Sequence, residues 1–393
     1  MVVMKIFFSA GEPSGDQHTA HLIAHLQKTC PDVVAEGFGG PAMQKQGCSL
    51  LFELTTMAVM GILRVLPMIR QFRQVVKMAE THFDTSPPDA IVLIDFPGFN
   101  WWIAKAARRR GIPVYYYLPP QLWAWAPWRI RKVRRDIDHV ICALPFEFEW
   151  YKERGVACTW VGHPFFDEVA AAQLDNKLVD AMRSTPERRT VALLPGSRDH
   201  EVRGNFPVIL EVVRSVAARV DNLRWVVGGF RADQVDVCRQ LEQAANLNFQ
   251  LEYCTGQTSE VIEAADCCLM VSGSISLELL ARRTPGIVVY RISKKARLAA
   301  RLLMQCRFIT LTNLIADREL MPEFVSAGDP TADIAAMADC LTEWCSNPAS
   351  LAAAQEEMRQ LADHAAECGA TTRAADLILE LCGSAKAGIR QAA

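Results

Sequence analysis

The chain has 393 residues, which is longer than a single hydrophobic core usually grows, so we expect two domains. Half of the residues are hydrophobic, 22% are charged and the net charge is -2, a composition that excludes a disordered chain and gives no support to nucleic-acid binding. The thirteen cysteines form no matched C-x-x-C pairs, so we interpret them as reduced thiols of a cytoplasmic protein.

The N-terminal half alternates apolar, strand-like runs with helical patterns. The first strand, 2–8, leads into the turn AGEPSGD at 10–16, and a helix follows that we expect Ser14 or Asp16 to cap. A turn between a strand and a helix is where α/β proteins hold ligands. Its spacing is neither G-x-G-x-x-G nor a P-loop, so it predicts either an unnamed site or an ordinary turn. Further strands are expected at 33–40, 90–95, 112–118 and 139–144.

The strand at 90–95 ends in Asp95. Burial at the end of an apolar strand raises the pKa of a carboxyl group, which suits a general base that works near neutral pH. Asp95 could equally form an Asx-turn or cap the helix that follows it. Downstream, we expect the tryptophans of one proline-rich loop to pack inside the protein: Trp123, Trp125 and Trp128.

The C-terminal half repeats the scheme, with strands expected at 190–195, 224–229, 249–254, 267–272 and 286–291. A proline-glycine turn places Arg198 where it could bind phosphate oxygens. Three residues after a later strand would form an anion site at a helix N-terminus: Ser272, Gly273 and Ser274. Glu278 could accept hydrogen bonds from a ribose or could simply stabilise the first turn of that helix. Together these features favour a nucleotide diphosphate.

This alternation predicts an α/β fold of two doubly wound, Rossmann-like domains with parallel sheets. We place the domains at 1–170 and 185–375, the second with C-terminal packing helices, and predict a flexible tail at 376–393. In such folds the natural place for a ligand is a cleft between the carboxyl ends of the strands.

Three segments could contact a membrane. The run 57–69 is apolar on nearly every side, which favours membrane docking over a buried helix, and its expected contact residues are Val59, Ile62, Leu63 and Leu66. The basic segment 129–135 and the basic amphipathic segment 294–308 could face anionic lipid or only water. No run approaches the roughly 20 apolar residues of a membrane span.

A series of motifs in consistent order resembles bacterial lipid-A-disaccharide synthases, which are glycosyltransferases with the two-domain fold called GT-B. The motifs cover nearly the whole length: AGEPSGD (10–16), FGGPAMQKQG (38–47), MAVMGILRVL (57–66), LIDFPGFN (93–100), QLWAW (121–125), LPFE (144–147), VGHP (161–164), LLPGSR with a following glutamate (193–201), SGS with LE (272–278) and TNLI with RE (312–319).

The resemblance implies transfer of 2,3-diacylglucosamine from its UDP derivative to 2,3-diacylglucosamine 1-phosphate, with inversion and without a metal or other cofactor. Asp95 would be the base, and Ser14 and Gly15 would shape the opening loop. The other substrate-binding residues would be Arg198, Glu201, Ser272, Gly273, Ser274, Glu278 and Asn313. Acylated substrates imply a protein at the cytoplasmic surface of the inner membrane. The oligomeric state stays open, a homo-oligomer included.

The chain departs from the family pattern at Pro13, Gly98, Ser274 and the segment YLPP at 117–120. These departures concern acceptor detail more than the type of reaction. Two alternatives remain: a UDP-sugar epimerase of the same fold, and a non-catalytic, lipid-binding paralogue. The single Asp-x-Asp, at 136–138, lies in a basic helix and is not expected to bind a metal.

Overall fold

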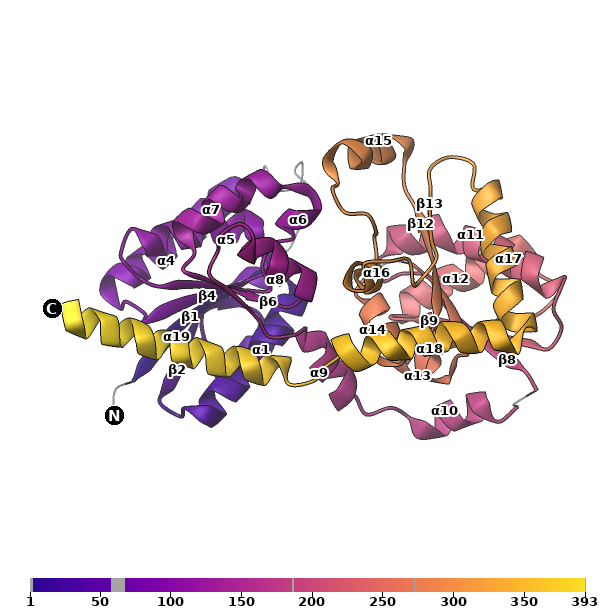
Figure 1. Ribbon diagram of the computed structural model, residues 1–393, viewed down its shortest axis with the longest axis horizontal. Coiled ribbons are helices and arrows are strands. Elements are labelled where there is room, and N and C mark those ends of the chain that lie inside the picture. The colour runs from indigo at the N-terminus through magenta and orange to yellow at the C-terminus, as the bar shows by residue number, and fades with distance from the viewer. Residues whose placement is uncertain (1–2, 58–67, 186, 272, 393) are drawn as a thin grey trace. The chain divides into compact units, whose positions relative to one another are not determined.

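The computed structural model describes residues 3–57, 68–185, 187–271 and 273–392 (Figure 1). The chain forms two compact units. The first unit consists of Met1–Asp167 together with Cys368–Ala393, and the second consists of Glu168–Glu367. The predicted strands therefore distribute over two separate sheets.

The first unit contains a seven-stranded parallel sheet in the order β3-β2-β1-β4-β5-β6-β7. Its strands are β1 (Met4–Ala10), β2 (Val33–Gly39), β3 (Ser49–Glu53), β4 (Ala90–Ile94), β5 (Val114–Tyr117), β6 (His139–Cys142) and β7 (Cys158–Trp160). Its helices are α1 (Pro13–Thr29), α2 (Pro41–Lys45), α4 (Ile69–Thr85), α5 (Pro97–Arg108), α6 (Leu122–Trp125), α7 (Ile130–Asp136), α8 (Pro145–Lys152) and α19 (Ala370–Ala392), with 3₁₀ turns η1 (Leu54–Met57) and η3 (Pro127–Arg129). The helix α9 (Pro164–Ala171) spans the boundary between the units.

The second unit contains a six-stranded parallel sheet in the order β10-β9-β8-β11-β12-β13. Its strands are β8 (Arg189–Leu194), β9 (Leu223–Gly229), β10 (Glu252–Thr255), β11 (Cys267–Val271), β12 (Gly286–Arg291) and β13 (Glu323–Ser326). Its helices are α10 (Asn176–Arg183), α11 (Asp199–Ala217), α12 (Ala232–Ala245), α13 (Thr258–Ala264), α14 (Ile275–Ala281), α15 (Lys294–Leu303), α16 (Leu311–Ala316), α17 (Thr331–Ser346) and α18 (Pro348–Ala365).

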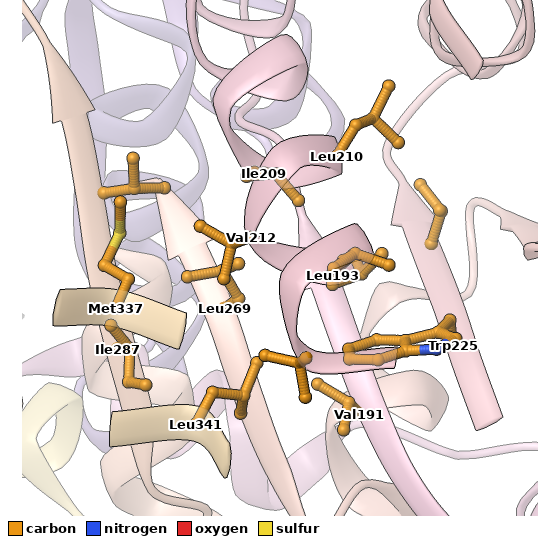
Figure 2. Packing of buried hydrophobic residues seen from close by; sticks show 14 of the residues in the cluster. Val191, Leu193, Ile209, Leu210, Val212, Trp225, Leu269, Ile287, Met337 and Leu341 are labelled. Carbon is orange, nitrogen blue, oxygen red and sulfur yellow. The ribbon is translucent and has the colours of Figure 1, made fainter. Parts of the chain in front are cut away.

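Apolar side chains of each sheet pack against apolar side chains of the helices that cover it. The strand β4 is buried along its whole length, as expected for a central parallel strand covered on both faces. In the second unit, side chains of α11 and α17 pack on residues of four neighbouring strands, as Figure 2 shows for Val212, Met337, Leu193, Trp225, Leu269 and Ile287. Such packing fixes the strand ends, and with them the loops that follow the strands.

The order of the strands reverses once in each sheet, between β1 and β4 in the first and between β8 and β11 in the second. In doubly wound sheets, ligands bind beyond the carboxyl ends of the strands at this reversal. The loops at these four strand ends are the ones that the sequence singled out: the glycine-rich turn, Asp95, the turn before Arg198 and the turn at Gly273. The topology therefore brings the candidate residues of each unit to the edge where a ligand is expected.

The division of the chain differs from the predicted 1–170 and 185–375, because the last helix returns to the first unit. The segment 376–393, predicted as a flexible tail, is helical to Ala392 within α19, and α19 runs along α1 (Figure 1). Asp167 accepts hydrogen bonds from the backbone N–H groups of Gly369, Ala370 and Thr371, at 2.5, 3.3 and 2.8 Å, and so caps the start of this helix. Small buried residues such as Ala374 allow its close packing.

Candidate active site

Asp95 follows β4 in a strained backbone conformation. Asp95 and Phe96 have φ values of 46° and 43°, in the left-handed region that residues other than glycine rarely adopt. Three hydrogen bonds hold this turn: the side-chain amide of Asn100 donates to the carbonyls of Ile94 (3.0 Å) and Asp95 (2.9 Å), and the Tyr116 hydroxyl donates to the Asp95 carbonyl (2.6 Å). Strain that the surroundings maintain in this way is typical of functional sites.

The carboxyl group of Asp95 has the properties of a base that works near neutral pH. Burial, and secondarily the negative charge of Glu12, raises its pKa to about 7, while the nearby His18 acts in the opposite direction. No hydrogen bond within the described residues ends on this carboxylate. The following helix, α5, begins at Pro97 after Phe96, and no side chain caps it. The alternative role of Asp95, as a turn or cap residue, therefore lacks the bond that would define it.

The glycine-rich turn lies directly beside Asp95. A Cβ atom on Gly11 would lie 2.2 Å from Cδ1 of Phe96, so only glycine fits there. A Cβ atom on Gly15 would lie 3.6 Å from Oδ2 of Asp95, which places the first turn of α1 against the carboxylate. Ser14, in the same turn, is exposed.

The capping role expected of Ser14 or Asp16 was wrong for α1. This helix begins at Pro13 after Glu12, and no side chain caps it. The Asp16 carboxylate instead accepts hydrogen bonds from the backbone N–H groups of Gly40 (2.8 Å), Ala42 (2.9 Å) and Met43 (3.1 Å) at the start of α2. Asp16 thus fixes the loop after β2 to the candidate site.

In the second unit, Arg198 is held with its guanidinium facing solvent. The backbone turns after β8 at Gly196, with a φ of 109°. Oε2 of Glu201 accepts hydrogen bonds from the N–H groups of Ser197 and Arg198, both at 3.2 Å, and Oε1 accepts one from Nη1 of Arg198 at 2.8 Å. The Arg198 side chain is 51% exposed, whereas that of Glu201 is 6% exposed. Arg198 is therefore the residue of this pair that a ligand can reach, and Glu201 orients it.

The loop between β11 and α14 is the second candidate site of this unit, and backbone N–H groups would be its contribution. Gly273 and Ser274 are exposed ahead of α14, while Ser272 lies outside the described residues. The hydroxyl of Ser276 donates to the Gly273 carbonyl at 3.1 Å and ties the turn to the helix. No hydrogen bond of the Ser274 side chain caps α14.

Glu278 is buried one turn into α14 and belongs to an ion-pair cluster. Its Oε1 accepts a hydrogen bond from Nε of Arg282 at 3.0 Å, and Nη1 of Arg282 donates to Glu263 at 3.2 Å. The side chains of Glu278 and Arg282 are only 9% and 7% exposed. A carboxylate that is held this firmly is preorganised to accept further hydrogen bonds, as well as stabilising its helix.

Asn313 is fully buried, and its side chain is saturated. Its amide group donates to the Met321 carbonyl (2.7 Å) and to Glu323 (2.9 Å), and its oxygen accepts from the N–H groups of Leu320 and Met321, both at 2.8 Å. An asparagine side chain has no further hydrogen-bonding capacity. Asn313 therefore shapes the segment before β13, and direct contact of its side chain with a ligand would require that segment to open.

Comparison with known proteins decides the family. The sequence model of the family described as Lipid-A-disaccharide synthetase matches residues 6–377. The lipid-A-disaccharide synthase of Myxococcus xanthus (strain DK1622) is 34% identical over 382 residues, which cover 96% of this chain and 97% of that relative. The chain belongs to the lipid-A-disaccharide synthetase family.

Solved structures show the same fold at low sequence identity. The UDP-GlcNAc 2-epimerase of Neisseria meningitidis, bound to UDP-GlcNAc, matches with a TM-score of 0.64 at 11% identity, covering 96% of this chain and all of that one. The calicheamicin glycosyltransferase CalG4 matches with a TM-score of 0.59 at 14% identity, covering 98% and 99%. These likenesses, with the two parallel sheets, confirm the predicted GT-B fold.

Sequence reasoning missed Glu147 as a residue of interest. It lies in the first turn of α8, buried, and accepts a hydrogen bond from the indole N–H of Trp123 at 3.2 Å. Burial raises the pKa of its carboxyl group to about 8. The motif LPFE contained this residue, but its partner is 24 positions away. The prediction that all three tryptophans are internal holds for Trp123 and is wrong for Trp128, which is 60% exposed. It is also wrong for Trp125.

The described residues contain no cluster of three or more potential metal ligands. Both acids of the Asp-x-Asp sequence have other partners: Asp136 pairs with Arg135, and Asp138 accepts from Arg108 and from the Val114 N–H. Within the same residues, no helix is long and apolar enough to cross a bilayer.

Proposed function

We propose that the chain is an inverting glycosyltransferase that joins two acylated glucosamines, with UDP as the leaving group. The donor is the UDP derivative of 2,3-diacylglucosamine, and the acceptor is 2,3-diacylglucosamine 1-phosphate. The product is the β-1,6-linked disaccharide 1-phosphate of lipid A. The observation that carries the proposal is the family match over residues 6–377, within which Asp95 has the burial and pKa of a base.

In the proposed reaction, Asp95 takes the proton from the 6-hydroxyl of the acceptor as that oxygen attacks C1 of the donor sugar. The bond from C1 to the diphosphate breaks on the opposite face, which inverts the anomeric centre. The electron pair leaves with UDP, and the proton stays on Asp95 until water removes it. A carboxyl pKa of about 7 allows both steps near neutral pH. The charges of Glu12 and His18 shift the pKa of Asp95 in opposite directions, Glu12 upward and His18 downward.

The second unit would bind UDP. The exposed guanidinium of Arg198 would bind the diphosphate, because its donor groups match phosphate oxygens and its charge offsets the charge that develops on the leaving group. The backbone N–H groups of the exposed residues Gly273 and Ser274 would add hydrogen bonds to the same anion. Ser272, which lies outside the described residues, stays a predicted member of this site. Glu278 would accept the ribose hydroxyls.

Two other members of the predicted site would act indirectly. Glu201 would hold Arg198, and Asn313 would hold the segment before β13. In the first unit, Ser14 and Gly15 would line the acceptor side of Asp95.

We further propose that the protein works on the cytoplasmic surface of the inner membrane, because both sugars carry acyl chains. The predicted contact residues Val59, Ile62, Leu63 and Leu66 lie outside the described residues and stay a prediction from the sequence. Changing Val59, Ile62 and Leu66 to serine should reduce binding to anionic vesicles while leaving transfer between short-chain, soluble substrates largely intact. A variant that precipitates or melts much earlier would instead indicate a buried helix.

The direct test is incubation of the purified protein with the UDP-diacylglucosamine donor and the lipid acceptor, followed by mass spectrometry. The proposal predicts a disaccharide monophosphate and one UDP per product, both formed about 10²–10⁴-fold more slowly with Asp95→Asn. Conversion of the UDP-sugar to an epimer without any acceptor would identify an epimerase instead. Binding of both lipids without turnover would identify a lipid-binding paralogue.

A further inference from the structure

The helix α15 exposes apolar side chains that nothing in its own unit covers. Leu298 and Leu302 lie one helical turn apart and are 63% and 77% exposed, and Leu303 is 54% exposed. No residue of α15 is buried. In Figure 1 the helix lies at the end of an excursion of the chain between β12 and α16. Large exposed apolar side chains that are grouped in this way mark an interaction site.

The same helix carries a concentrated positive charge. Its ten residues include four cations and no acid: Lys294, Lys295, Arg297 and Arg301. Within the described residues, none of these four side chains forms an ion pair with a carboxylate. With a net charge of -2 for the whole chain, this charge is local to the helix. Cations with long side chains beside exposed leucines are the composition of helices that lie in a lipid interface.

A helix of this length needs a partner surface. Isolated helices shorter than about 12–15 residues are only marginally stable in water, and most helices in proteins are stabilised by packing of their apolar face. The cap from Ser293, whose hydroxyl oxygen accepts from the Ala296 N–H at 3.1 Å, supplies one local contact. Coverage of the leucines must therefore come from outside the unit.

We propose that α15 is an interfacial anchor whose leucines insert into the surface of an anionic bilayer while its cations contact the lipid phosphates. A negatively charged bilayer satisfies both features of the helix at once, since it offers an apolar layer beneath an anionic one. A second copy of the chain fits less well. A two-fold dimer through this helix would bring the four cations of one copy near the four of the other, with no acid on either helix to offset them. The anchor adds a second contact to the segment 57–69 and depends neither on that segment nor on the transferase activity.

The test uses the full-length protein and vesicles of phosphatidylcholine with or without phosphatidylglycerol. The anchor predicts binding to the anionic vesicles that weakens with added salt, and slowed amide hydrogen exchange in 294–304 when these vesicles are present. The double variant Leu298→Ser/Leu302→Ser should bind about tenfold or more weakly. The double variant Arg297→Glu/Arg301→Glu should lose most of the salt-dependent binding.

Matched controls come from the same unit. Phe230→Ser removes an apolar side chain that is 67% exposed, and Arg239→Glu reverses a cation on α12; both should bind like the unmodified protein. Because α15 buries no side chain, its variants should keep the parent melting temperature. Unchanged hydrogen exchange in 294–304 on anionic vesicles would overturn the proposal. So would protection that appears without vesicles and grows with protein concentration, since that result indicates a second copy as the partner.

Discussion

Asp95→Asn should separate a catalytic from a structural role by moving activity and stability in opposite directions. The substitution keeps the size and shape of the side chain but removes its ability to take a proton. If Asp95 is the base, turnover at saturating donor and acceptor should fall about 10²–10⁴-fold, the usual contribution of general-base catalysis. UDP affinity should barely change, because we place the base against the acceptor.

The structure also sets the expected change in stability. Burial holds the pKa of Asp95 at about 7 in the folded protein, against a reference value of 3.8. An acid whose pKa rises on folding favours the folded state fully below the lower value, and this contribution is lost as the pH rises through the higher one. Above pH 7 the ionised carboxylate should therefore destabilise the fold by up to about 4 kcal/mol, at 1.36 kcal/mol for each pH unit between the two values. Asparagine removes that penalty.

Urea unfolding of the wild type and of Asp95→Asn at acidic and at alkaline pH measures this effect. The variant should equal the wild type near pH 4 and exceed it clearly above pH 8. The wild-type rate should rise with pH through about 7, because the base must be deprotonated. An asparagine variant with near-normal turnover, or with lower stability than the wild type at alkaline pH, would refute the reasoning.

Three further substitutions test the surroundings of the site. Glu12→Gln should lower the pKa of Asp95 and move the acidic limb of the rate profile to lower pH, because it removes a nearby negative charge; an unmoved limb would contradict the coupling. Arg198→Ala should weaken UDP binding about ten- to a hundredfold in calorimetry, the usual loss of a charged hydrogen bond, and unchanged affinity would exclude it from the donor site. Glu147→Gln keeps an acceptor for the Trp123 indole and should raise stability in urea above pH 8 but not near pH 4; equal stabilisation at both values would point to packing instead of charge.

The interior strands and the edge strand β10 could be predicted from the sequence, whereas the other three edge strands could not. Every strand predicted from an apolar run exists within a few residues of its expected bounds. The missed strands β3, β7 and β13 each lie at a sheet edge and have only three to five residues, mostly half-buried. An edge strand needs apolar residues on fewer sides, so its pattern is weak. The continuation of α19 beyond residue 375 was missed for a related reason. Each alanine buries little surface, so an alanine-rich helix gives only a weak apolar pattern.

At the candidate site, the sequence indicated where along the chain the candidate residues lie. It did not indicate which residues form hydrogen bonds with one another. Asp95 could be singled out because an acid at the end of an apolar strand is visible in the sequence. The saturation of Asn313 by Leu320 and Met321, and the hold of Glu201 on Arg198, depend on how the backbone turns. A motif specifies which residue type stands at a place in the fold. It does not show whether that side chain contacts a ligand or positions a neighbouring side chain.

In the turn AGEPSGD, different residues meet different structural requirements of the candidate site. Gly11 lacks a side chain because the ring of Phe96 occupies that space, and Phe96 lies there because the chain turns sharply at Asp95. Gly15 leaves the space beside the Asp95 carboxylate open. Asp16 turns away and fixes the start of α2 through three backbone N–H groups. Two of these residues thus shape the surroundings of one carboxylate, and the third anchors the neighbouring loop. A glycine-rich turn can therefore have specific structural requirements without matching the G-x-G-x-x-G or P-loop spacing.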